Sequence, residues 1–211
     1  AYLLEQMEGL YITMASSPLF PSQYAHSRRI ACDAWAGIGD TEYTLNSLTY
    51  GWWLNQVYTY NDPDHLLLEP VSDGENRARI TSGVITGIFM NGDDLSYISG
   101  IQVAKDKARK FLTNEDINAI AKMGKSFRPV NGIMDGADFL FMHDTGKEVY
   151  LTEFIYSCYD LTYDLPLSRL GLRESSTYKA KELWSGKEVK FKKNVRVCIP
   201  KKDVLVFRIT R

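Results

Sequence analysis

The chain has 211 residues, of which 45% are apolar and 24% are charged, and its formal net charge is −1. This is the composition of a folded globular protein, long enough for one large domain or two small ones. The near-zero charge provides no field that would attract nucleic acid or an anionic membrane surface, and no apolar run approaches the roughly 20 residues of a membrane span, so neither is expected as a partner.

The cysteines and the start of the chain carry little information about its compartment. Cys32, Cys158 and Cys198 are an odd number at wide spacings, which indicates neither a metal site nor a disulfide framework. The sequence opens on AYLLEQMEGL, which has helix-forming character from the first residue and no signal-peptide pattern. We expect the chain to begin within an element, so that any signal peptide would lie upstream. The localisation is therefore unknown, although a secreted or periplasmic protein is compatible with the sequence.

Up to about residue 125, short strand-like runs alternate with longer helical runs, which predicts βα units around a parallel sheet. Residues 41–55 are expected to form a helix with Tyr50, Trp52 and Trp53 in the core. Thr113 is the expected N-cap of a later helix. The expected strands are residues 10–15, 28–32, 57–60 and 87–90, and the remaining helices are residues 77–84 and 114–123.

From about residue 134 the pattern changes to short strands separated by turns, which predicts a second, all-β domain. The sequence thus divides into domains at 1–128 and 129–211. The basic run from Lys187 to Lys202 falls on alternating strand positions and is interpreted as a solvated sheet face. The expected strands are residues 138–142, 148–156, 178–184, 187–191, 195–199 and 204–209.

The size of the first domain leaves two architectures open. A closed (β/α)₈ barrel usually needs about 250 residues, and the first domain has about half of that. Four predicted strands therefore fit either half of such a barrel or a small, self-contained α/β layer. Composition alone does not choose between the two.

Polar side chains gather after each of the four predicted parallel strands, where a barrel would place its chemistry. Each aspartate taken singly is also a common helix cap or turn former, but a cluster at all four strand ends favours a site. Aromatic residues lie between the clusters, which is typical of carbohydrate sites although not specific to them. The clusters are Ser16-Ser17-Pro18-Leu19-Phe20, Cys32-Asp33-Ala34-Trp35, Asn61-Asp62-Pro63-Asp64-His65 and Asn91-Gly92-Asp93-Asp94.

Several other kinds of site lack support in the sequence. His26, His65 and His143 have no metal-ligand spacing, and no Ser-His-Asp or Cys-His pairing can be read from the linear order. The pair Gly37-x-Gly39 lacks the third glycine and the preceding strand of a phosphate-binding loop. We therefore expect neither a metal nor a cofactor.

Three segments resemble motifs of a known family. Arg29, Asp33 and Trp35 have the spacing Arg-x-x-x-Asp-x-Trp, Asn61-Asp62-Pro63-Asp64 follows Tyr60, and a later apolar run ends in Asn91-Gly92-Asp93-Asp94-Leu95. In this order they resemble segments of the melibiase-type α-galactosidases and α-N-acetylgalactosaminidases of glycoside hydrolase family 27. The family has Trp where this chain has Tyr60, and its Asn-Asp-Leu segment is one residue shorter.

This resemblance covers about residues 10–125, and the β domain by its architecture. It implies the second half of a (β/α)₈ TIM barrel followed by an antiparallel β-sandwich. It also implies that Asp33 is the acid/base of a retaining glycosidase and that Arg29 binds the sugar. The other residues that it implies in substrate binding are Ser16, Phe20, Asp64 and His65.

Two departures from the family matter. The family's nucleophile lies in a Tyr/Lys-x-Asp strand motif upstream of the segments found here, and this chain has no such motif. The segment from Ser16 to Phe20 aligns with Cys-Glu-Trp-Pro-Leu-Tyr in galactosidases and with Cys-Ser-Trp-Pro-Ala-Tyr in N-acetylgalactosaminidases. Ser16 follows the second pattern and Leu19 the first, so the preferred sugar 2-substituent stays open, with simple galactosides expected.

The resemblance implies that the whole protein acts on terminal α-galactosides, and that this chain alone is inactive without the nucleophile. Two alternatives stay open: a non-catalytic carbohydrate-binding or structural module, and a related glycosidase with another sugar specificity. Besides the carbohydrate substrate, the expected partner at the open edges of a half-barrel is a second copy of the chain or an N-terminal half of the same protein.

Overall fold

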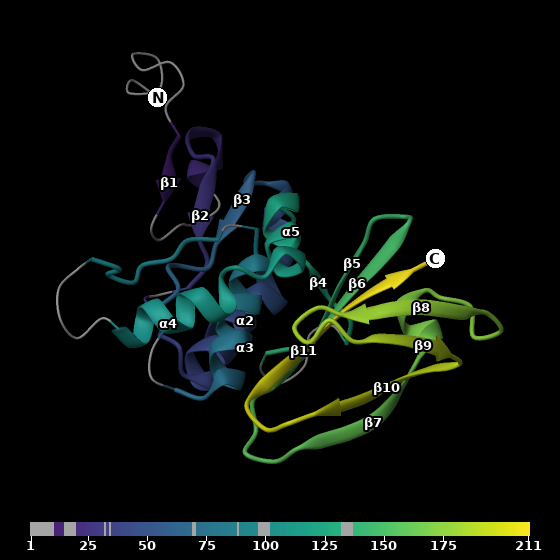
Figure 1. Cartoon of the computed structure of the whole chain (residues 1–211). Coiled ribbons are helices and arrows are strands. Elements are labelled where there is room, and N and C mark those ends of the chain that lie inside the picture. The colour runs from purple at the N-terminus through teal and green to yellow at the C-terminus, as the bar shows by residue number, and fades with distance from the viewer. Residues whose placement is uncertain are drawn as a thin grey trace.

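The chain folds into a helical part with a short parallel sheet and a strand part beside it (Figure 1). The structure is a computed structural model, and it describes residues 11–14, 20–31, 33, 35–68, 71–87, 89–96, 102–131 and 137–211. Strands of the first part are all parallel, whereas those of the second part are all antiparallel.

The parallel sheet has the order β1 (Thr13–Met14), β2 (Ser27–Arg29) and β3 (Tyr60–Asp62), with the 3₁₀ helix η1 (Phe20–Tyr24) between β1 and β2. The predicted strands at 28–32 and 57–60 are therefore displaced by one to three residues. The prediction of a strand at 87–90 is wrong for the residues that are described there. That segment meets the sheet region through a single parallel bridge between Leu66 and Asn91, because Gly87 has a φ of 120° and bends the chain.

The described residues include four α-helices beside this sheet: α2 (Ile38–Gly51), α3 (Asp73–Val84), α4 (Gln102–Phe111) and α5 (Glu115–Met123). The 3₁₀ helix η2 (Trp52–Gln56) continues α2. Helix α4 was not predicted, because its charged sequence buries essentially Phe111 alone. Within the described ranges, no helix combines the length and apolar character that crossing a membrane requires.

The ends of the helices follow local capping rules. A capping box joins Ser72 and Glu75 at the start of α3. Asn114, rather than the predicted Thr113, caps α5 by accepting a hydrogen bond from the Ile117 N–H. Helix α5 ends at Gly124, whose φ of 57° suits glycine.

The predicted burial of the aromatic residues around the end of α2 is only partly correct. Trp52 packs against the core. Tyr50 and Trp53 are 43% and 42% exposed, respectively. Their rings lie at the surface because α2 gives way to η2 at this point, which turns the chain away from a regular helical face.

The strand part forms one curled sheet in the order β4-β5-β6-β11-β8-β9-β10-β7. Strand β7 was not predicted, whereas the other strands longer than two residues lie within one to two residues of prediction. Tight turns connect β5 to β6 and β9 to β10, and η3 (Leu167–Leu170) follows β7. The strands are β4 (Arg128–Pro129), β5 (Leu140–Asp144), β6 (Glu148–Ile155), β7 (Leu161–Pro166), β8 (Thr177–Glu182), β9 (Glu188–Lys192), β10 (Asn194–Ile199) and β11 (Asp203–Thr210).

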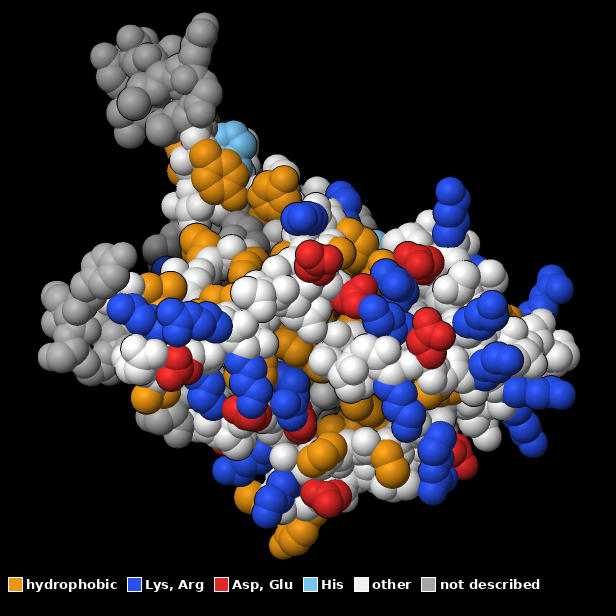
Figure 2. All heavy atoms as spheres, in the orientation of Figure 1, with side chains coloured by type: hydrophobic (Ala, Val, Ile, Leu, Met, Phe, Trp, Pro, Cys, Tyr) orange, Lys and Arg blue, Asp and Glu red, His pale blue; other side chains and the backbone are white. Residues whose placement is uncertain are grey.

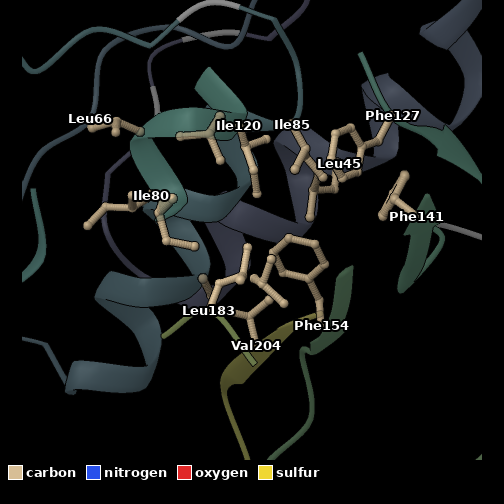
Figure 3. Packing of buried hydrophobic residues seen from close by; sticks show 14 of the residues in the cluster. Leu45, Leu66, Ile80, Ile85, Ile120, Phe127, Phe141, Phe154, Leu183 and Val204 are labelled. Atoms are coloured by element: carbon tan, nitrogen blue, oxygen red, sulfur yellow. The ribbon is translucent and has the colours of Figure 1, made fainter. Parts of the chain in front are cut away.

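Strand β6 is buried on both faces and so separates two hydrophobic cores. Val149 and Leu151 face the core of the strand part. Phe154, together with Val204 of β11, points at the helices and packs in one cluster with Leu45 and Ile85 (Figure 3). Helices and sheet are therefore joined by a continuous apolar core rather than by a linker.

Candidate active site

The polar residues predicted after β2 and β3 lie together at the carboxyl ends of these parallel strands. Arg29 ends β2 and Asp62 ends β3, and the two residues are directly paired in the parallel register. The Ile30 N–H donates to the Asp62 carbonyl at 2.8 Å, which keeps the two chains adjacent as they leave the sheet. We refer to Arg29, Asp33, Asp64 and His65 as the carboxylate site.

Arg29 joins the two aspartates of the carboxylate site. Its Nη1 donates to Asp33 Oδ1 at 3.1 Å, and its Nη2 lies 2.7 Å from Asp64 Oδ1. His65 Nδ1 lies 3.0 Å from the same Asp64 oxygen. The Asp33 side chain is 66% exposed whereas that of Asp64 is fully buried. Asp33 is therefore the carboxylate of this site that a ligand can reach directly.

The loop after β3 holds Asp64 in an uncommon conformation. Asp64 has a φ of 71°, a region that aspartate tolerates better than most residues. Its backbone N–H donates to Asp62 Oδ1 at 2.8 Å, so the two aspartates form an Asx turn. Burial raises the pKa of the Asp62 carboxyl, and this hydrogen bond and Arg29 oppose the rise. Asp62 thus braces the loop, and Asp64 fixes the position of Arg29.

A buried arginine from α3 supports the same loop. Arg79 donates to the His65 carbonyl at 2.9 Å and approaches the Pro63 carbonyl at 3.4 Å, and it also donates to Ser82 Oγ. Burial lowers its pKa to about 10, and the nearby Asp64 carboxylate opposes this shift. Sequence reasoning missed Arg79 because a lone arginine within a helical run gives no sign of the loop that it contacts.

The segment around Asn91 packs against this loop, as a fourth strand of the sheet would. The parallel bridge consists of two backbone hydrogen bonds of 2.9 Å: the Leu66 N–H donates to the Met90 carbonyl, and the Gly92 N–H donates to the Leu66 carbonyl. Asp93 accepts the Leu68 N–H at 2.9 Å, which makes it a loop brace. A Cβ on Gly92 would lie 2.8 Å from the His65 ring, so glycine is required for this close approach. The Asn-Gly-Asp segment therefore shapes the site although it forms no strand.

Several buried polar atoms around the site have no partner among the described residues. They are Arg29 Nε, Asn61 Oδ1 and Asp64 Oδ2. Asn61 uses its amide nitrogen to donate to Ser126 Oγ at 3.1 Å. Buried polar atoms are normally hydrogen-bonded. The site therefore has hydrogen-bonding atoms that no group in the described part of the chain satisfies.

Two residues that the resemblance implies in substrate binding, Ser16 and Phe20, have no described side chain. Ser16 and Leu19 lie outside the described residues. Phe20 begins η1, which follows β1, but its side chain is likewise outside the description. Across the residues that are described, no group of three His, Cys, Asp or Glu side chains has the arrangement of metal ligands.

The geometry suits proton transfer next to a fixed cation. Asp33 has a solvent-exposed carboxylate, and the Arg29 guanidinium lies 3.1 Å from it. A guanidinium that bonds two carboxylates at once has little freedom and can orient a hydroxyl-bearing ligand. Asp64 and Asp62 are both committed to internal contacts.

A family model matches the strand part. Residues 149–209 match the alpha galactosidase C-terminal beta sandwich domain. No curated protein sequence matches the chain significantly. The domain match covers β6 to β11 and agrees with the antiparallel sheet observed there.

Solved structures of glycosidases share the fold of nearly the whole chain. The family 27 β-L-arabinopyranosidase of Geobacillus stearothermophilus in complex with arabinose has a TM-score of 0.75 at 16% identity, over 95% of this chain and 50% of that one. α-Galactosidase I of Mortierella vinacea has a TM-score of 0.66 at 11% identity, over 90% and 54%.

A third structure, a putative α-N-acetylgalactosaminidase of Bacillus halodurans, has a TM-score of 0.66 at 14% identity, over 85% of this chain and 44% of that one. The chain thus spans about half the length of the structures that it matches. The resemblance to the melibiase-type family is confirmed to this extent: residues 149–209 match the α-galactosidase C-terminal β-sandwich domain, and the chain shares its fold with solved glycosidases that include a family 27 enzyme.

Proposed function

We propose that this chain is the C-terminal portion of a retaining glycoside hydrolase that acts on terminal α-galactosides. One observation carries the proposal: Arg29 holds the exposed Asp33 and the buried Asp64 together at the carboxyl ends of parallel strands. In barrel enzymes, catalytic residues lie at this end of the sheet. The first domain, residues 1–128, is then half of a (β/α)₈ barrel, and residues 129–211 form the β-sandwich.

Asp33 is the proposed acid/base. It would protonate the leaving-group oxygen and then activate water, whereas Arg29 would bind a sugar hydroxyl and His65 would lie at the pocket mouth. Retaining chemistry needs a second carboxylate about 5–5.5 Å from the acid/base. Asp62 and Asp64 are buried and occupied, so we assign the nucleophile to a part of the whole protein beyond this chain.

Replacement of Asp33 by Asn in the whole enzyme tests this assignment. We expect glycosides with poor leaving groups to lose on the order of 10²–10⁴ in rate, because they need protonation, and activated aryl glycosides to lose less. Asp106→Asn, an exposed change on α4, is the matched control and should leave both rates unchanged. A loss of under tenfold on both substrates would show that Asp33 is not the acid/base.

A non-catalytic carbohydrate-binding module is the second candidate. It is favoured by the presence of a single exposed carboxylate in the carboxylate site, since Asp64 is fully buried. Hydrolysis of nitrophenyl α-galactoside, α-N-acetylgalactosaminide and β-arabinopyranoside by the whole protein distinguishes the possibilities. Turnover of one of them identifies the sugar, and binding without turnover of any of them supports the module.

A further inference from the structure

The outward face of the β8–β9 hairpin places like charges opposite one another. In the antiparallel register Lys179 is paired with Lys190, and Thr177 with Lys192. All four side chains are exposed. Like charges directly opposite across a strand pair are destabilising, so this arrangement weakens the hairpin unless an anion lies over it.

Neighbouring cations on the same side of the sheet have carboxylate partners. Lys181 lies 2.5 Å from Asp116, and Arg208 lies within 4 Å of both Asp116 and Glu148. These contacts neutralise the part of the sheet that adjoins α5.

The hairpin itself is not neutralised in this way. Four of its lysines have no ion pair with any residue that the structure describes. Of the two carboxylates on the hairpin, Glu182 is buried, and Glu188 lies opposite Lys181 in the register rather than opposite one of these four. Figure 2 shows Lys and Arg side chains gathered over the region of β8 and β9. We call these lysines the basic face: they are Lys179, Lys187, Lys190 and Lys192.

Two open grooves flank the basic face and share Val189 and Lys190 in their walls. The larger, of about 960 Å³, runs between β9 and the helices, and apolar side chains including Trp184 and Leu205 line it. The smaller, of about 750 Å³, lies over β8 and the end of β11. A chain that crosses the hairpin could therefore occupy both grooves.

The two carboxylates in the wall of the larger groove are already used. Asp203 accepts from Arg77 Nε at 3.0 Å and from its Nη2 at 2.5 Å. Glu182 accepts the backbone N–H groups of Ser185 at 2.7 Å and Val206 at 3.2 Å. Neither leaves a carboxylate free to neutralise the lysines of the basic face.

We propose that the basic face binds an acidic polysaccharide, a polymer of uronic acid residues, across the β8–β9 hairpin. Such a chain carries a carboxylate on each sugar for the lysines, and its C–H faces fit the apolar groove wall. A nucleic acid fits less well, because the free cations of this face are all lysines: Arg196 beside it is paired with Asp164, which leaves no free arginine there to bind phosphate in a bidentate way. This site does not depend on the proposed hydrolysis.

Affinity electrophoresis of the purified 211-residue chain in gels that contain polygalacturonate tests the proposal. We expect retardation by polygalacturonate, none by uncharged dextran, and loss of the effect at 0.5 M salt, because screening shortens the reach of exposed charges. The variant Lys179→Gln/Lys190→Gln should bind on the order of threefold to tenfold more weakly. Its unfolding temperature should not fall, since the cross-strand repulsion is removed.

Lys122→Gln/Lys125→Gln makes the same change in charge at exposed positions at the end of α5 and just beyond it, and should bind as the parent does. A second variant, Lys187→Gln/Lys192→Gln, tests the same face without touching the cross-strand pair. Equal losses in the patch and control variants, or stronger retention by a single-stranded oligonucleotide than by polygalacturonate, would overturn the proposal.

Discussion

Glu153 is an ionisable residue inside the core of the strand part. It lies on β6, is 2% exposed, and neither of its carboxylate oxygens has a hydrogen-bond partner of normal geometry among the described residues. Burial raises its pKa to about 7, and the nearby Tyr163 hydroxyl opposes this only in part. The folded protein therefore holds this carboxyl protonated under conditions in which the unfolded chain would ionise it.

The pH dependence of stability follows from this pKa. The contribution of Glu153 to the free energy of unfolding is fully present below about pH 4.5, the ordinary pKa of a glutamate, and is lost as the pH rises through about 7. The loss should amount to about 3 kcal/mol. Urea unfolding between pH 4.5 and 8 should show the parent losing stability that the Glu153→Gln variant retains.

Glu188→Gln provides the matched control, because Glu188 is exposed on β9. Its stability should fall with pH as steeply as that of the parent. A parent and a Glu153→Gln variant with parallel stability curves would show that the Glu153 pKa is not raised.

At the scale of elements, the contact between α3 and β11 depends on a glycine. A Cβ on Gly74 would lie 2.6 Å from the Lys202 carbonyl oxygen and 2.9 Å from Asp203 Cγ. The first of these atoms is backbone and the second is held by the ion pair with Arg77, so neither can move away easily. The first turn of α3 therefore reaches the sheet only without a side chain at this position.

Gly74→Ala should destabilise the chain by about 1–3 kcal/mol, because the clash separates α3 from β11. Gly39→Ala in α2 is the contrasting change, since nothing lies within 4 Å of the added Cβ. There alanine should stabilise the helix by up to about 1 kcal/mol. Chemical unfolding of both variants measures these changes in stability. Equal effects of the two substitutions would show that the contact between α3 and β11 does not depend on Gly74.

At the scale of the whole molecule, the helices and the sheet share one core. Phe154 and Val204 of the strand part pack in the same cluster as Leu45 and Ile80 of the helices (Figure 3). The parallel sheet, by contrast, has an open side: β1 pairs with β2 alone among the described strands. We infer that the two parts stabilise each other and that the edge at β1 is available to a partner.

We therefore predict that the 211-residue chain alone does not turn over nitrophenyl α-galactoside and that it self-associates. The missing nucleophile explains the first expectation and the open edge at β1 the second. Activity and molar mass in solution, compared with the monomer value of 24.0 kDa, measure both. Robust turnover would make Asp62 or Asp64 the nucleophile despite their burial, and an inactive monomer would show that the chain closes its own sheet.

Local patterns in the sequence predicted most of the elements and pointed to the residues of the carboxylate site. Alternation predicted six of the seven longer strands of the strand part, and Asn61-Asp62-Pro63-Asp64 marked the end of β3 and the loop after it, because turn chemistry and side-chain period are properties of neighbouring residues. Arg29 and Asp33 were identified by the Arg-x-x-x-Asp spacing of the family that they resemble, whereas their ion pair is a finding of the structure, since Arg29 ends a strand. Contacts between residues that are far apart in the sequence leave no such local pattern.

The tertiary structure alone decided which of these residues act together. It buried Asp64 while it left Asp33 exposed, brought Arg79 from α3 to the loop, and fixed the register that sets Lys179 opposite Lys190. Each of these depends on the packing of segments far apart in the sequence, since burial and register are set by the shared core and not by propensity. The sequence by itself therefore determined which polar and charged side chains are present, and the packing decided which of them are exposed to a ligand.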